Sequence, residues 1–395
     1  MEESRELLEN TDWSVLHHAY DFATDTPEHL EALLVGDEAS VKEALDHLWS
    51  AILHQGTPWT ATAPVATFVI SFMQDKRIER FTWLPAFLMA FLADVAQVPE
   101  YAGISNKREL EDMGKPDYHS ALLSNPDDVF ADEDLGNAFY AHSLIGCIRL
   151  APQLWHVMQN TLTRTDINKS CRMSAVMGAA SLVKLDSFQG QRTSLETQIL
   201  ALAKGADSVD ERSTYILALN DLGCSSVAFL NDPSPAIRYC SALSKAPKNS
   251  DIALDELSRL LAQYSKDQMD AWFDETPPQF NIKPYFVGIQ RLVSSERPFD
   301  QYLNVALCAL KTANKHSVDY DWGVLLAAAF SDSSGQIKTP AQYYYLKALV
   351  ANKALWDESW GNAFRWFKEA GLPYDRSACQ AFLSEIQLED IGVHT

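Results

Sequence analysis

Paired carboxylates are the first side chains in this 395-residue sequence that could carry acid–base chemistry. Asp270 and Asp274 are four residues apart, and Asp319 and Asp321 flank a single tyrosine. On a helix, residues four apart share a face, where two like charges repel slightly. We therefore expect both pairs to be hydrated surface groups rather than a catalytic acid and base.

Three histidines, His17, His18 and His54, lie beside the expected turns of the N-terminal helices. A catalytic histidine needs an orienting partner and a nucleophile, and no pattern in the sequence specifies either. The sequence also lacks GxxxxGK[ST] and GxGxxG phosphate loops, an HExxH zinc motif and a GxSxG nucleophile elbow. We predict that these histidines pack or cap at turns, and that the protein is not an enzyme and needs no cofactor.

The run Asp132-Glu133-Asp134-Leu135-Gly136 is the best candidate for a calcium loop. If its glycine made the sharp turn, a leucine would occupy a position that requires an oxygen ligand, and the closing glutamate is absent. The run instead predicts a solvated helix N-terminus, where the helix dipole favours acidic side chains. We expect no metal site.

Cysteine usage and the N-terminus indicate the compartment. No two of the six cysteines form a CxxC pair, so we expect small buried hydrophobic groups in a reducing environment rather than disulfides or a zinc site. The opening MEESRELLEN has no apolar signal region. The uncharged stretch 47–74 is interrupted by proline, threonine and serine, so it does not predict a membrane span. A soluble, cytoplasmic protein is expected.

Charge is the strongest compositional signal. The net charge is −21, and residues 1–150 hold 26 acids against nine bases. A surface this acidic repels nucleic-acid phosphates and anionic lipids, and it favours basic proteins as partners. A nucleic-acid enzyme is disfavoured for the same reason.

Hydrophobic periodicity predicts an all-α protein. The apolar residues of 41–52, 65–73 and 84–95 recur at the i, i+3, i+4, i+7 spacing of a helix face, and similar stripes continue to residue 350. Between the first two stripes, Gly56 suits a left-handed position, Thr57 a helix N-cap and Pro58 a first helical residue. This punctuation predicts two antiparallel helices joined by a short turn.

An Asp followed six residues later by an Arg recurs in the sequence, at Asp166/Arg172 and Asp232/Arg238, with a looser copy five residues apart at Asp207/Arg212. An Asp at an inter-helix turn and an Arg in the next helix could pair with neighbouring copies and form a ladder. This pattern resembles the repeats of HEAT α-solenoids, in which stacked helix pairs wind into an extended concave surface.

A second likeness lies near the N-terminus. The segments Leu16–Tyr20 and Ala51–Thr62 are similar to the HAY-like opening and the HQG-x-x-x-AT turn of bacterial HEAT-type proteins, many of which occur in toxin–immunity contexts. The resemblance implies a solenoid of stacked antiparallel helix pairs that binds another protein.

Two stretches interrupt the helical pattern. Residues 98–131 are polar and rich in proline and glycine, and they predict an irregular acidic insertion, since long unstructured connections are often functional. The proline-rich stretch 274–284 predicts a soft boundary near 275. We expect a repeat region over 1–275 and an aromatic-rich helical region over 276–395 packed on the same solenoid.

These observations predict a protein-binding module, in its sharpest form an immunity protein that neutralises a basic bacterial toxin. The alternatives are a general interaction scaffold and, against the charge, a HEAT-fold nucleic-acid enzyme. The candidate partner-binding residues are the acids in and after the insertion: Asp112, Asp117, Asp127, Asp128, Asp132, Glu133 and Asp134.

Overall fold

The computed structural model describes residues 2–102, 131–246, 250–356 and 361–391. Over these residues the chain is helical, and its only β-type pairing is an isolated antiparallel bridge between His17 and Phe22. The prediction of an all-α protein is confirmed for the described chain. No helix in these ranges is long and apolar enough to cross a membrane. The chain divides into two compact units, residues 1–207 and 208–395.

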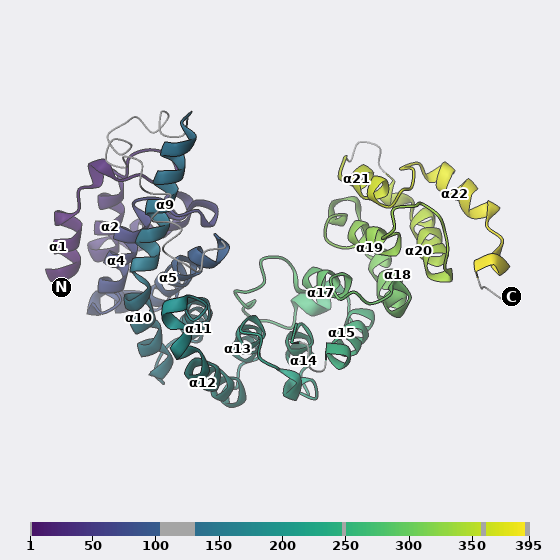
Figure 1. Ribbon diagram of the computed structural model, residues 1–395. Coiled ribbons are helices and arrows are strands. Elements are labelled where there is room, and N and C mark those ends of the chain that lie inside the picture. The colour runs from purple at the N-terminus through teal and green to yellow at the C-terminus, as the bar shows by residue number, and fades with distance from the viewer. Residues whose placement is uncertain (1, 103–130, 247–249, 357–360, 392–395) are drawn as a thin grey trace. The chain divides into compact units, whose positions relative to one another are not determined.

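The first unit contains nine α-helices among the described residues (Figure 1). They are α1 (Glu2–Asn10), α2 (Thr26–Val35), α3 (Glu38–His47), α4 (Thr62–Phe72), α5 (Leu84–Tyr101), α9 (Glu133–Arg149), α10 (Ala151–Thr163), α11 (Lys169–Leu182) and α12 (Arg192–Gly205). Short helical turns are η1 (Trp13–Val15), η2 (Leu48–Ile52), η3 (His54–Gly56), η4 (Lys76–Arg80) and η5 (Asp186–Gln191).

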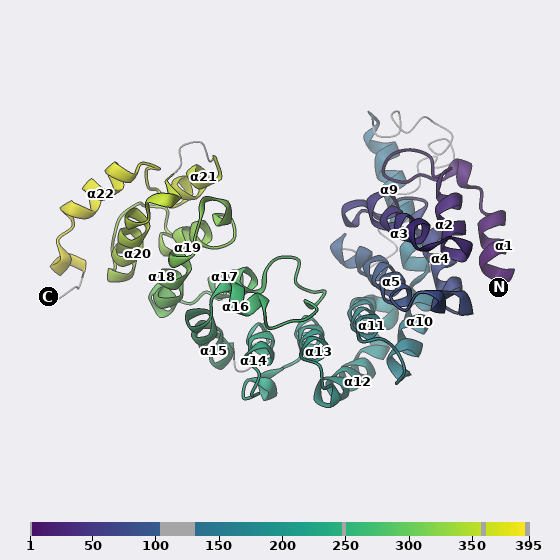
Figure 2. The same cartoon turned by 180° about the vertical axis from the view of Figure 1, so that it is seen from behind.

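Helix α5 is central to this unit, because it packs against α4, α9 and α11. The periodicity of 84–95 predicts one buried stripe on this helix, and five of its six residues are buried: Leu84, Leu88, Phe91, Leu92 and Val95. The sixth, Phe87, is 49% exposed. At Gly178 of α11 an added Cβ would lie 3.0 Å from the Cα of Ala93, so the two helices touch through their backbones. Figure 2 shows α3 beside α2, with which it packs.

The second unit is also a succession of helices packed on their neighbours. They are α13 (Val209–Asp221), α14 (Pro235–Ala242), α15 (Ser250–Gln263), α16 (Lys266–Asp270), α17 (Pro284–Val293), α18 (Leu303–Lys311), α19 (Trp322–Ala329), α20 (Pro340–Ala351), α21 (Gly361–Glu369) and α22 (Arg376–Glu385). Short turns are η6 (Val227–Phe229), η7 (Phe299–Tyr302), η8 (Lys315–Ser317), η9 (Lys353–Leu355) and η10 (Leu388–Ile391).

Contacts in the second unit run mostly between elements close in sequence. Helix α14 packs between α13 and α15, α15 contacts α17 and α18, and α20 contacts α18, α19 and α22 (Figures 1 and 2). This neighbour packing is compatible with a helical repeat fold. The stretch 274–284, where the sequence suggests a soft boundary, lies within this unit. Its backbone N–H groups at Asp274 and Glu275 donate to the buried Asp210 carboxylate.

One rung of the expected Asp–Arg ladder is present. Arg212 of α13 donates to Asp232, which lies in the turn before α14, so the pair joins two successive helical layers. The other copies bond differently. Asp166 pairs locally with Arg164, and Arg238 binds Glu256 of α15.

Three local expectations are wrong. Gly56 is left-handed with φ +77° as predicted, but Thr57 and Pro58 do not start a helix, because α4 begins only at Thr62. The residues just before α4 bond to another segment instead of forming a helical turn, since the Ala61 N–H donates to the His17 carbonyl. The irregular insertion was expected from residue 98, yet α5 continues through Pro99 to Tyr101.

The third wrong expectation concerns Asp321, which was predicted to be hydrated. Its side chain is fully buried and accepts a 2.6 Å hydrogen bond from the ammonium group of Lys266. Burial raises the pKa of Asp321, and the attraction of Lys266 only partly opposes this shift. Asp319, by contrast, is bound by the side chains of Asn362 and Trp366. These carboxylates connect helices instead of forming a paired acid–base site.

Candidate functional site

The predicted acidic run lies at the start of α9. Asp132 is the N-cap, and its carboxylate accepts hydrogen bonds from the backbone N–H groups of Asp134 and Leu135. Asp132, Glu133 and Asp134 are all exposed. The structure therefore places these three predicted residues together in solvent at a helix N-terminus. The other four, Asp112, Asp117, Asp127 and Asp128, lie outside the described residues.

Exposed acids are also dense on the first three helices and in the loops beside them, outside the predicted partner-binding residues. Residues 1–50 contain thirteen acids and two bases. Eleven of the twelve acids whose side chains the structure describes in this stretch are exposed, whereas loop length in the sequence pointed to the later insertion. We call these eleven the N-terminal acidic surface: Glu3, Glu6, Glu9, Asp12, Asp21, Asp25, Glu28, Asp37, Glu38, Glu43 and Asp46.

The two bases among residues 1–50 are already engaged within the protein. Arg5 binds Glu31 at 2.9 Å, and Lys42 binds Glu38 one helical turn away at 2.7 Å. Each pair cancels one negative charge, so an excess of eleven acids over bases remains in residues 1–50. The N-terminal acidic surface consequently presents a strong excess of negative charge to solvent.

The HAY-like and HQG segments, which are about 40 residues apart in the sequence, meet in the structure. The His17 N–H donates to the Thr60 hydroxyl at 2.7 Å, and the Ala19 N–H donates to the Ala51 carbonyl. Tyr20 and His54 contact edge to face, with ring centroids 5.7 Å apart. These contacts join the segment before α2 to the turn before α4, so the HAY-like and HQG segments form one structural centre.

The histidines of this centre pack as the sequence predicts. The His17 ring is buried between Phe22 and Phe139, and burial lowers its pKa. Burial, with the nearby His29 as a further cause, lowers the pKa of His47 to about 4. Both rings are therefore neutral near pH 7.

One group in the centre has side chains suited to metal binding. His18, Asp25 and His47 bring their potential ligand atoms within 4.8 Å of one another. Hydrogen bonds nevertheless already engage these side chains. His18 Nδ1 accepts from the N–H groups of Tyr20 and Asp21, which leaves its Nε2 to donate to Asp25 at 2.9 Å. The His47 Nε2 atom forms a 3.0 Å hydrogen bond with the hydroxyl of Thr26, the first residue of α2. These hydrogen bonds hold the loop before α2 and the start of that helix.

The carboxylate of Asp25 responds to this network. Burial is the largest single influence and would raise its pKa, but the hydrogen bond from His18, the attraction of His18 and His47, and a backbone hydrogen bond together hold the pKa below its usual value. A charged Asp25 therefore both anchors the loop and adds to the N-terminal acidic surface.

Cysteine chemistry is suppressed where the thiols are buried. Burial raises the pKa of Cys147, Cys171 and Cys240 to about 12 each. A thiol with such a pKa is protonated at neutral pH and is a poor nucleophile or metal ligand. All six cysteines are free, in agreement with the expectation of no disulfides.

Comparisons with known proteins add no assignment: no family model, no curated protein and no solved structure matches the chain.

Proposed function

We propose that the protein is a non-enzymatic binding protein that captures a basic protein partner through the N-terminal acidic surface and the acidic start of α9. The sharpest form of this proposal is an immunity protein that neutralises a cognate bacterial toxin inside the cell. We further propose that the neighbour-packed helices form an α-solenoid, which would present an extended surface to such a partner.

The observation that carries the proposal is the concentration of exposed acids on α1 to α3. Like charges held this close raise the energy of the folded protein through self-repulsion, and a cationic partner relieves that repulsion. Complementary charge also speeds encounter and rejects phosphate-bearing competitors. Toxins that act on nucleic acids or nucleotides often have basic clefts, which an acidic protein can occupy.

The test uses the basic protein encoded next to this chain in its native host, because an immunity protein is expected beside its toxin. Binding should weaken steeply as salt rises from about 0.05 M to about 0.5 M, since the screening length falls severalfold. The variant Glu6→Lys/Glu43→Lys/Asp46→Lys should bind at least about tenfold more weakly and should lose protection of cells that express the toxin.

A matched control separates local from global charge. The variant Asp267→Lys/Glu385→Lys/Glu389→Lys changes the net charge by the same amount at exposed sites of the second unit. It should retain binding and protection. Equal loss in both variants, or binding that salt does not affect, would contradict the proposal.

The alternatives predict different results. A general scaffold would co-purify from the native host with several partners in variable stoichiometry, whereas an inhibitor would give one partner in a fixed ratio. A gel shift with DNA or RNA at moderate salt would favour the nucleic-acid enzyme instead.

A further inference from the structure

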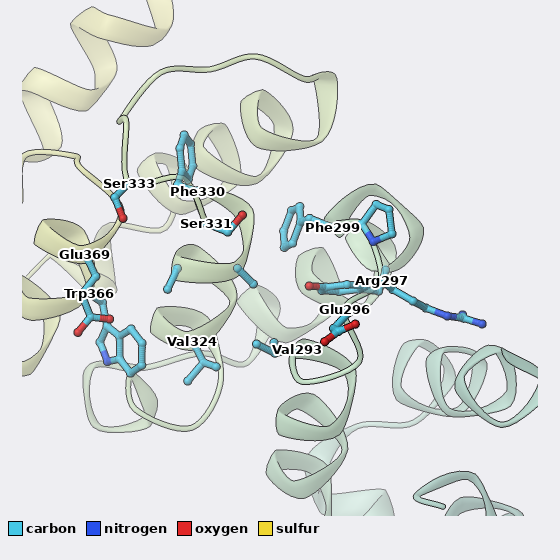
Figure 3. Close-up of a pocket in the computed structure, with 14 residues that line it drawn as sticks. Val293, Glu296, Arg297, Phe299, Val324, Phe330, Ser331, Ser333, Trp366 and Glu369 are labelled. Atoms are coloured by element: carbon cyan, nitrogen blue, oxygen red, sulfur yellow. The ribbon is translucent and has the colours of Figure 1, made fainter. Parts of the chain in front are cut away.

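A hollow of about 690 Å³ opens on the second unit between the end of α17 and helices α19 and α21 (Figure 3). Its volume falls in the range of about 300–1,000 Å³ that is common for small-molecule sites. The apolar part of its lining includes Phe299, Val324, Ala328 and Trp366. In Figure 3, Phe299 and Trp366 lie on opposite sides, with Val324 between them.

Two carboxylates stand on these opposite sides, Glu296 beside Phe299 and Glu369 beside Trp366 (Figure 3). Glu296 is exposed. Glu369 is half-exposed and forms an ion pair with Arg365, one helical turn earlier, at 3.7 Å. Glu296 is therefore the carboxylate of this rim that is more open to a ligand.

The cation that lines the hollow does not neutralise these carboxylates. The Arg297 guanidinium extends away from the hollow in Figure 3 and binds Asp251 and Asp255 at 3.1 and 2.7 Å. Those two aspartates complete its charge pairing. The hollow thus combines an apolar floor with a net negative rim.

Trp366 is held in place by three contacts. Its Nε1–H donates to Asp319 at 2.8 Å, and the Arg365 guanidinium lies 4.6 Å from its ring centroid. Its indole also lies against the α19 backbone at Gly323, where an added Cβ would be 2.5 Å from the Trp366 Cδ1 atom. An aromatic wall fixed in this way loses little entropy when a ligand binds.

The rim adopts a backbone conformation that side chains rarely take. Glu296 and Ser333 both line the hollow, with φ of +60° and +54°. Non-glycine residues avoid this region, and they are held there only when the surrounding structure enforces it. The carboxylate of Glu296 is therefore displayed from a turn that the fold maintains.

We propose that this hollow receives the arginine side chain of a basic protein partner. An arginine has an apolar stem that suits the floor and a planar guanidinium that stacks on aromatic rings and donates to a carboxylate such as that of Glu296. Arginine is also enriched among the residues that dominate protein interfaces. This inference rests on the proposed function, because it names a chemical group by which the basic partner would be recognised.

The test uses a short probe and this chain alone. The peptide acetyl-Gly-Arg-Gly-amide is titrated against the full-length protein, and the indole N–H resonance of Trp366, assigned with Trp366→Phe, reports occupancy. The citrulline peptide keeps the shape of arginine without its charge. We expect a saturable shift with arginine and at least about tenfold weaker binding with citrulline.

Variants locate the binding. Glu296→Gln/Glu369→Gln removes both charges at exposed positions and should weaken arginine binding about as much as citrulline does, whereas Glu385→Gln should not change it. Ala328→Trp, which fills the hollow, should abolish the shift. Circular dichroism verifies that each variant folds.

Several results would overturn the inference: no saturable shift, equal affinity for the citrulline peptide, or equal affinity for a lysine peptide. The probe requires no partner, so its failure leaves the proposed function to its own salt and charge-reversal tests. The opposite result is also informative. If the arginine peptide binds but the variant Glu6→Lys/Glu43→Lys/Asp46→Lys still captures the partner normally, the proposed function is refuted and the arginine site is not.

Discussion

The ion pair between Lys266 and Asp321 provides the sharpest test of how the second unit is held together. Lys266 begins α16 and Asp321 is the N-cap of α19, so the pair connects two helices far apart in sequence. The Lys266 side chain is 12% exposed and that of Asp321 is 0% exposed. The ammonium group also lies 4.9 Å from the Phe286 ring centroid, which adds a cation–π contact.

The perturbation is Lys266→Met, which keeps most of the aliphatic stem and removes the charge. At the 2.6 Å separation and an effective dielectric constant of about 20, the attraction is about 6 kcal/mol. Part of this attraction offsets the cost of burying both ions. Removing one partner of a buried pair typically costs about 3–5 kcal/mol, because the other charge remains buried and uncompensated. We expect that loss in the free energy of unfolding at pH 7.

The loss should depend on pH in a definite direction. The pKa of Asp321 is already raised by burial, and removal of Lys266 raises it further. A carboxyl with a raised folded-state pKa favours folding below its unfolded value of about 3.9, and this contribution is lost as pH rises. The variant should therefore lose more stability at pH 7 than at pH 4.5.

Urea unfolding, followed by tryptophan fluorescence and by far-ultraviolet circular dichroism, measures both quantities. Lys368→Met, at an exposed lysine of α21, is the matched control and should change stability by no more than about 0.5 kcal/mol. Lys266→Met/Asp321→Asn should recover part of the loss, because it removes the buried charge. A loss below about 1 kcal/mol, or one that is the same at both pH values, would refute the account of a buried pair.

Three further predictions concern other contacts. The pKa of Asp75 is lowered to about 2, mainly by its hydrogen bond from Arg77, so the charged carboxylate should add about 2 kcal/mol to the free energy of unfolding above pH 4. In urea unfolding, Asp75→Asn should be less stable than the parent protein at pH 7, and this difference should shrink as pH falls towards 2. Gly178→Ala should cost about 1–3 kcal/mol by thermal unfolding, whereas Gly205→Ala, where space is open, should not destabilise. A double-mutant cycle of Arg212→Ala and Asp232→Ala should give a coupling free energy of about 0.5–3 kcal/mol. Additive losses of stability would show that this ion pair does not stabilise the fold.

Much of the local structure follows from the sequence. Helical periodicity predicted α4 and most of the buried face of α5, because apolar side chains that recur every 3.6 residues lie on one face only in a helix. The left-handed Gly56 was likewise predictable from residue type. The dense acids of residues 1–150 also predict, without any fold, that phosphate-bearing partners are disfavoured.

Contacts between distant segments were decided only by the tertiary structure. The start of α4 moves from Pro58 to Thr62 because His17, about 40 residues earlier, bonds the intervening backbone and the Thr60 hydroxyl. Asp321 is buried instead of hydrated because Lys266 supplies its counter-charge, and no local spacing encodes that pairing.

The candidate sites show the same division between composition and folding. The number of acids on α1 to α3 could be read from the sequence, but their joint exposure depends on which helix faces are covered. The hollow of the second unit is lined by both Glu296 and Glu369, which are 73 positions apart in the sequence. Residue types set the available charge and helical propensity, whereas packing decided which charges meet, because burial and electrostatic attraction act through space and not along the chain.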